Sequence, residues 1–103
     1  MRESDIQNTI CEYLTMKGYF FFRVNTIPVY DTKTKVFRRM PKYAKAGVSD
    51  LILILNGQFV GLEIKQEHGI QSEHQKLFQQ GVERNGGKYL LIRSLNDLIQ
   101  QGL

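Results

Sequence analysis

The chain has a single cysteine, Cys11, and no long run of apolar residues. One cysteine excludes an intrachain disulfide, and such a chain is typical of a reducing compartment, so we expect a cytoplasmic, intracellular protein. We interpret Cys11 as a small core residue rather than a nucleophile. The first residues resemble no signal peptide, and no stretch is long and apolar enough to predict a transmembrane span.

Prolines are also few, at Pro28 and Pro41, and no repeat, linker or low-complexity segment divides the sequence. A chain of 103 residues, 42% of them hydrophobic, has enough residues for one core but not two. We therefore expect a single domain over residues 1–103. The net charge of +4 permits a polyanionic partner without requiring one. His68 and His74 lack a fixed helical spacing, so we assign them no metal role.

The clearest local pattern is a β-hairpin that begins with Leu51. Leu51 to Leu55 is a continuous apolar run of strand length, and apolar residues alternate with others in Gln58 to Lys65. Asn56-Gly57 lies between these runs and favours a two-residue type I′ turn, in which both residues need a positive φ. Because so short a loop fixes the register, the sequence predicts which residues of the two strands lie opposite each other.

This register places Asp50 opposite Glu63 on one face, with Lys65 pointing the same way. Opposed carboxylates repel each other, and Mg²⁺ or Mn²⁺ would remove that cost, because hard cations prefer oxygen ligands. The alternative is a surface hairpin in which Lys65 merely screens Glu63. The aliphatic strand favours a buried hairpin, whose charges need partners. We therefore predict a metal site at Asp50 and Glu63, where Lys65 activates a water or neutralises a phosphate.

The spacing of these residues resembles a known signature. Asp50, twelve intervening residues and then Glu63-Ile64-Lys65 is similar to the motif of PD-(D/E)XK nucleases, with Ser49 where many members have proline. More of the chain resembles a stand-alone VRR-NUC domain. The points of resemblance are Glu3, the segment Lys45-Ala46-Gly47-Val48-Ser49-Asp50, the segment Gly61-Leu62-Glu63-Ile64-Lys65, and Gln75.

The resemblance implies an α/β fold with a restriction-endonuclease-like core, in which helices flank a mixed β-sheet in the order α-β-β-β-α-β-α. It implies Mg²⁺- or Mn²⁺-dependent hydrolysis of phosphodiester bonds, and Holliday junctions as substrates of small stand-alone members. It adds the carbonyl of Ile64 as a metal ligand. Gln75 would hold a phosphate or a water, and Glu3 would be an outer metal ligand or position the metal's water. From the residues alone, Glu3 favours a helix dipole and Gln75 is a cap partner.

Periodicity and capping patterns predict the remaining elements. Ser4 with Gln7 resembles a capping box, and Ser72 with Gln75 resembles another. We expect helices over about Asp5 to Lys17, Glu73 to Arg84 and Leu95 to Gln100, and strands over Tyr19 to Val24 and Lys88 to Arg93. A second hairpin is predicted from Ile27–Tyr30 and Val36–Arg38 around the Asp31–Lys35 turn.

One segment, residues 33–45, is basic and contains no acidic residue. Its basic residues are Lys33, Lys35, Arg38, Arg39, Lys42 and Lys45, and Tyr30, Phe37 and Tyr43 are interleaved with or flank them. Charge runs are usually solvated loops. This segment, however, leads directly into Asp50, where basic residues would attract a phosphate backbone and aromatic rings could stack on bases. We therefore predict a nucleic-acid-binding segment.

These features favour a metal-dependent DNA endonuclease acting on branched DNA, with a flap or single-strand nuclease as a variant of that activity. A DNA-binding module without catalysis is the alternative from another class, but such a module would gain nothing from two opposed carboxylates. A metal-binding interaction protein is the third reading. Two symmetric nicks in a four-way junction need two active sites, so we also expect a homodimer, with Tyr30 and Phe37 available for its interface.

Overall fold

The computed structural model describes residues 2–24, 30–31, 36–37 and 42–103, with no side-chain description for 30–31 and 36–37. Its elements are α1 (Glu3–Lys17), β1 (Phe21–Arg23), β2 (Tyr30–Asp31), β3 (Val36–Phe37), β4 (Leu51–Leu55), β5 (Gln58–Ile64), α2 (Glu73–Arg84), β6 (Lys88–Ile92) and α3 (Leu95–Gln100). Outside the predicted second hairpin, every predicted helix and strand is therefore present, with shifts of one or two residues at several ends.

A four-stranded sheet in the order β1-β4-β5-β6 forms the centre of the molecule. The β1–β4 and β4–β5 pairs are antiparallel and β5–β6 is parallel, so the sheet is mixed as predicted. Leu55 pairs with Gln58, and Asn56 and Gly57 both have positive φ, which confirms the predicted turn and register. Strands β2 and β3 form a separate antiparallel pair, which confirms that the segments at Tyr30 and Val36 pair, although Asp31 lies in β2 and not in the turn. The predicted strand residues 27–29 and 38 lie outside the described residues.

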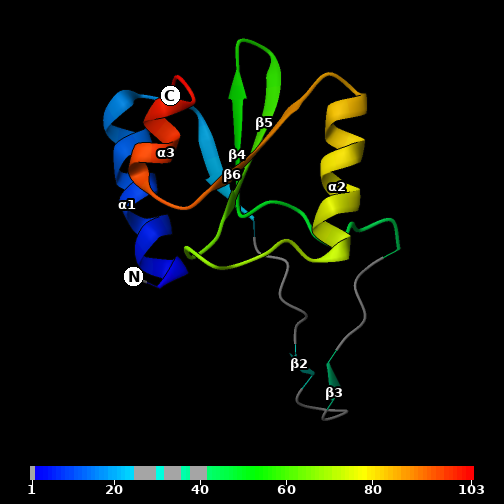
Figure 1. Cartoon of the computed structure of the whole chain (residues 1–103). Coiled ribbons are helices and arrows are strands. Elements are labelled where there is room, and N and C mark those ends of the chain that lie inside the picture. The colour runs from blue at the N-terminus through cyan, green and yellow to red at the C-terminus, as the bar shows by residue number, and fades with distance from the viewer. Residues whose placement is uncertain (1, 25–29, 32–35, 38–41) are drawn as a thin grey trace.

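Figure 1 shows three layers, with α1 and α3 on one side of the sheet and α2 on the other. The α1 and α3 side holds the hydrophobic core, because alternate residues of each strand point toward it. Its fully or nearly fully buried members are Ile6, Ile10 and Leu14 of α1, Leu51 and Leu53 of β4, Val60, Leu62 and Ile64 of β5, Ile92 of β6, and Leu98 of α3. Cys11 packs against this cluster, as predicted.

The α2 side of the sheet is more open and more polar. Helix α2 has no buried residue, and its Leu77 side chain is 62% exposed. Toward β1, Phe22 and Ile54 are both partly exposed on this face. The buried polar residues Ser49 and Glu63 belong to this part of the structure. The second face thus combines a loosely packed helix with buried polar groups.

Two capping predictions have opposite outcomes. Ser72 and Gln75 form the predicted capping box of α2. For α1, the prediction of Ser4 as cap is wrong: Arg2 is the N-cap residue and makes no side-chain cap bond. The main-chain N–H groups of Asp5 and Ile6 both donate to the carbonyl of Arg2, so the helix starts before Ser4. Within the residues that the structure describes, no helix is long and apolar enough to cross a membrane.

Candidate active site

Asp50 and Glu63 meet where β4 begins and β5 ends. Asp50 directly precedes β4, and its Oδ2 accepts a hydrogen bond of 2.8 Å from the main-chain N–H of Ile64. Glu63 is buried, with 2% of its surface exposed, while Asp50 is half-buried. The predicted juxtaposition of the two carboxyl groups is therefore present, and the pair lies at the end of the sheet rather than in its centre.

The environment strongly favours the neutral form of Glu63. Burial, which contributes most, a hydrogen bond with Asp50 and the negative charge of Asp50 together raise the pKa of Glu63 from 4.5 to about 8. The positive charge of Lys65 and a hydrogen bond from Tyr89 act the other way. Without a cation the neutral form of Glu63 therefore predominates near neutral pH.

Close backbone packing explains the glycines and the serine around this pair. Gly47 has φ +75°, and a Cβ there would lie 2.4 Å from the carbonyl carbon of His74, at the start of α2. Ser49 is fully buried and donates to the carbonyl of Leu51, and a Cβ on Gly61 would lie 2.7 Å from its hydroxyl. The segment that carries Asp50 can therefore lie against both α2 and β5 only because Gly47 and Gly61 lack side chains.

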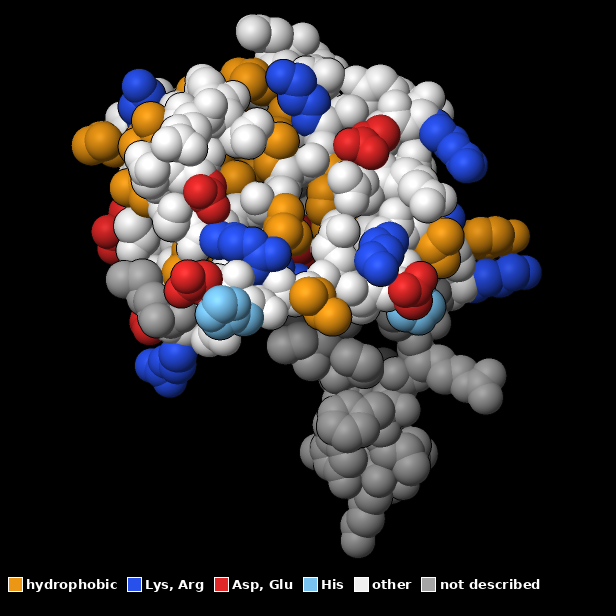
Figure 2. All heavy atoms as spheres, viewed as in Figure 1, with side chains coloured by type: hydrophobic (Ala, Val, Ile, Leu, Met, Phe, Trp, Pro, Cys, Tyr) orange, Lys and Arg blue, Asp and Glu red, His pale blue; other side chains and the backbone are white. Residues whose placement is uncertain are grey.

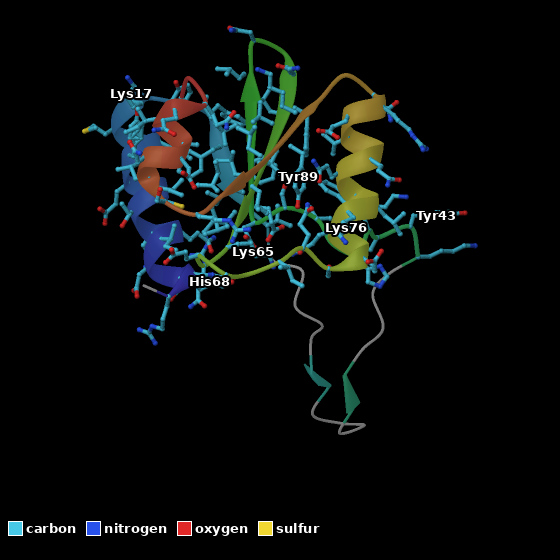
Figure 3. All side chains as sticks on the ribbon, in the orientation of Figure 1. Lys17, Tyr43, Lys65, His68, Lys76 and Tyr89 are labelled. Atoms are coloured by element: carbon cyan, nitrogen blue, oxygen red, sulfur yellow. The ribbon has the colours of Figure 1, made fainter. Side chains whose placement is uncertain are left out.

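Lys65 follows β5 and is half-buried at the start of the connector to α2. Its main-chain N–H donates to the carbonyl of Ile92, which extends the pairing with β6 by one bond. Figure 3 shows Lys65 where this connector leaves the sheet. Lys65 affects the pKa of Glu63 through its charge, so the predicted grouping of Asp50, Glu63 and Lys65 is present.

Arg93 holds the connector in place, a role that the sequence gave no reason to expect. Its Nη1 donates to the carbonyls of Gln66, Glu67 and Gly69. These contacts span 24 to 27 residues along the chain. The guanidinium therefore fixes the path of the backbone that leaves the candidate site.

Tyr89 is the second residue that sequence reasoning missed. It lies on β6 opposite Gly61, is 5% exposed, and its hydroxyl lies 3.4 Å from Oε1 of Glu63. Burial, the largest cause, raises the pKa of Tyr89 to about 12, so its hydroxyl keeps its proton at neutral pH. Tyr89 was part of a predicted strand, but the sequence does not fix the parallel register that brings it to Glu63.

The structure places Gln75 and Glu3 outside this contact network. Oε1 of Gln75 accepts the main-chain N–H of Ser72 at 2.9 Å, which is the role of a cap partner. Glu3 is exposed in the first turn of α1. Figure 1 shows that end of α1 at the same end of the molecule as the end of β5. Among the described residues, neither side chain makes a hydrogen bond or ion pair with Asp50 or Glu63, so their active-site roles stay predictions.

Most of the predicted nucleic-acid-binding segment lies outside the described residues. Lys33, Lys35, Arg38 and Arg39 lie outside the described residues. Lys42 and Lys45 are described and exposed, and Nζ of Lys42 lies 5.3 Å from the ring centre of Tyr43. Figure 2 shows basic and acidic side chains interspersed on one face of the described structure.

A cavity of about 620 Å³ lies on the α2 side of the sheet. Phe59, Leu77, Phe78 and Val82 give it an apolar lining, and Lys45 stands at its rim. The rings of Phe59 and Phe78 meet edge to face, as do those of Phe78 and Tyr89. Aromatic contacts therefore connect this cavity with the carboxylate pair.

The donor atoms at the carboxylate pair fit a hard divalent cation. The described parts of the chain contain no group of three or more His, Cys, Asp or Glu side chains that could hold a metal. Mg²⁺ does not need such a group, because it is typically held by one or two carboxylates and keeps several waters. Asp50 and Glu63 supply that number, and the half-buried position of Asp50 leaves access for water.

Comparison with known proteins supports the fold but not a family assignment by sequence. No protein-family model matches the chain, and no curated protein matches it. A solved structure described as a VRR_NUC domain protein superposes with a TM-score of 0.74, over 98% of this chain and 84% of that one, at 15% identity. At that identity the likeness concerns the fold alone. The chain therefore has the mixed α/β fold seen in a VRR_NUC domain protein, which confirms the predicted fold class.

Proposed function

We propose that this protein is a metal-dependent endonuclease that hydrolyses phosphodiester bonds in DNA. The observation that carries the proposal is the buried Glu63 beside Asp50 and Lys65 at one end of the sheet. A structural role does not account for this group, because burial and mutual repulsion of two carboxyl groups cost stability. The likeness in fold to a VRR_NUC domain protein supports the same conclusion.

Asp50, Glu63 and the carbonyl of Ile64 would hold Mg²⁺ or Mn²⁺. When bound, the cation supplies a water of lowered pKa and neutralises charge on the phosphate. The contact between Asp50 and the N–H of Ile64 supports this assignment, because it fixes one carboxylate beside that part of β5. Gln75 is a further candidate for the active site, but its side-chain oxygen already accepts a hydrogen bond at the start of α2. A role for Gln75 at a phosphate would therefore use its amide nitrogen.

Lys65 is the group we assign to the reacting phosphate. It either orients and deprotonates the attacking water or balances the charge that develops on the phosphate oxygens. Its ammonium group lies on a flexible stem that starts where β5 ends, so it can reach a backbone bound across the end of the sheet. Glu3, which is exposed at the start of α1, would position a water bound to the metal.

For the substrate we propose branched DNA, with a four-way junction as the first candidate. The basic residues that precede Asp50 would contact the phosphate backbone without reading sequence. A homodimer would present two sites to a two-fold junction. Light scattering at micromolar concentration then gives a mass near twice 12.0 kDa. A monomer that only nicks would instead favour the flap or single-strand nuclease.

The test is a cleavage assay on four-way, flap, splayed and duplex DNA, with and without Mg²⁺. Asp50→Asn is the first variant, because an amide oxygen can still accept the N–H of Ile64 while the charge is lost. It should cut no substrate, keep the unfolding temperature of the parent and still bind DNA in Ca²⁺. Lys65→Ala should lose about 10²–10⁴-fold in turnover with binding retained.

Glu67→Gln is the matched control, since this exposed carboxylate lies two residues after Lys65 and outside the proposed site. It should cut as the parent does. Cleavage by Asp50→Asn at the parental rate would refute the site. Tight DNA binding by the parent, without cleavage of any substrate in Mg²⁺ or Mn²⁺, would favour the non-catalytic binding module.

A further inference from the structure

Each carboxylate of the pair has one oxygen held by the protein. Oδ2 of Asp50 accepts the N–H of Ile64 at 2.8 Å. Oε1 of Glu63 faces the hydroxyl of Tyr89 at 3.4 Å. The second oxygen of each group is thus the one available to a cation. Carboxylates that bind metals are commonly oriented by such hydrogen bonds, and loss of these partners weakens metal binding.

The hydroxyl of Tyr89 is itself fixed from several sides. The Cα of Tyr89 pairs with that of Gly61, and Gly61 has no side chain to fill the space in front of the sheet. The edge of its ring contacts Phe78 of α2, with ring centres 6.2 Å apart. The side chain of Gln71 lies near enough to lower the pKa of the hydroxyl, and its Nε2 donates to Oε1 of Gln79 at 2.9 Å. The connector therefore approaches the hydroxyl through Gln71, whereas Phe78 of α2 contacts only the ring.

We propose that Tyr89 is a positioning residue that holds one oxygen of Glu63 and leaves the other to the divalent cation beside Asp50. The inference rests on the proposed function, since it assumes that Asp50 and Glu63 bind the cation. It adds a role for α2, which otherwise buries no residue and contributes little to the core. Gln79 of α2, which accepts the hydrogen bond from Gln71, then helps to orient the metal ligand.

The alternative is that Tyr89 only packs, and that its hydroxyl takes the nearest acceptor. Metal affinity in the absence of DNA separates the two roles, because packing alone has no effect on it. Tyr89→Phe removes the hydroxyl and keeps the ring. Phe78→Leu is the matched control, since it disturbs the packing of the ring and keeps the hydroxyl.

The experiment titrates the DNA-free protein with Mn²⁺ at one fixed pH, following free Mn²⁺ by electron paramagnetic resonance. We expect Tyr89→Phe to bind Mn²⁺ about 10-fold more weakly, at the low end of the range for such partners because the contact is long. Phe78→Leu should stay within about 2-fold of the parent, as expected where no polar partner of the ligand is lost. Gln71→Ala, which frees the hydroxyl without touching the core, should fall between them. Mn²⁺ should also raise the unfolding temperature less in Tyr89→Phe than in the parent.

Equal Mn²⁺ affinity of Tyr89→Phe and the parent would overturn the inference, even if the variant cut DNA more slowly. Equal losses in Tyr89→Phe and Phe78→Leu would also overturn it, because packing would then explain both. If Tyr89→Phe does not fold, Gln71→Ala decides, and parental affinity in that variant refutes the role. If the Mn²⁺ affinity of the parent depends on Tyr89 but the parent cuts no DNA, the proposed function is refuted and this inference stands.

Discussion

The two faces of the sheet differ in which side chains they bury, although alternate residues of one strand, β5, lie on both faces. Val60, Leu62 and Ile64 of β5 point into the core between the sheet and α1, and each is at most 1% exposed. Gly61 and Glu63, which alternate with them, point toward α2. One face buries only apolar groups, whereas the other buries a carboxyl group whose pKa is raised to about 8.

This difference indicates how the chain separates stability from function. The first face gains free energy from apolar area removed from water. The second face loses part of that gain, because a buried carboxyl group and an exposed Leu77 are both unfavourable in isolation. A cost of this kind is commonly found at functional sites, where charge must be held in a fixed place. Neighbouring residues of β5 should therefore respond to substitution in opposite directions.

The largest expected effect is on the core face. Leu62→Ala removes a fully buried side chain, so it should lower the free energy of unfolding by about 2–5 kcal/mol. Urea unfolding followed by circular dichroism measures this loss. Burial of one methylene contributes about 1 kcal/mol, so a loss of stability smaller than that would contradict full burial of Leu62.

The next effect is on Glu63, with the opposite sign. Because its folded pKa of about 8 lies above the unfolded value of 4.5, its contribution to stability is complete below pH 4.5 and disappears as the pH rises through about 8. Glu63→Gln cannot ionise, so in a chelating buffer it should be more stable than the parent at pH 9 by about 1–3 kcal/mol. At pH 5 the two proteins should nearly coincide.

Other groups also titrate over this range, so the informative quantity is the difference between variant and parent at each pH. The Gln amide can still donate to Asp50, which keeps the hydrogen bond between the two side chains. A difference that is the same at pH 5 and pH 9 would show that Glu63 is ionised throughout. The buried carboxyl group would then not make the stability of the second face depend on pH.

The sequence predicted those parts of the site that depend on local geometry. Asn56-Gly57 permits one turn type, and that turn fixed Asp50 against Glu63 without knowledge of any other element. The error at the start of α1 is also local. Ser4 and Gln7 satisfied the spacing of a capping box, but the helix begins at Glu3, two residues before the predicted start at Asp5.

The remaining features depend on contacts between distant segments. The register of β6 on β5 is set by α2, which connects them, so the position of Tyr89 opposite Gly61 had no local signal. The same holds for Arg93, whose partners are at least 24 residues away. Gly47 resembled a motif residue, yet its physical role is contact with the start of α2. Tertiary packing, and not propensity, decides such positions.

The smallest expected effect completes the comparison with a matched substitution on the second face. Leu77 of α2 is 62% exposed, so Leu77→Ala should change the free energy of unfolding by no more than about 0.5 kcal/mol. The same two residue types are exchanged as in Leu62→Ala, so the comparison isolates burial. A loss above about 2 kcal/mol would mean that Leu77 is covered in solution. If that loss increased with protein concentration, a second copy would be the cover, because stability that comes from association depends on protomer concentration. A large loss independent of concentration would instead mean that α2 packs more tightly on the sheet, and the two faces would differ less than described.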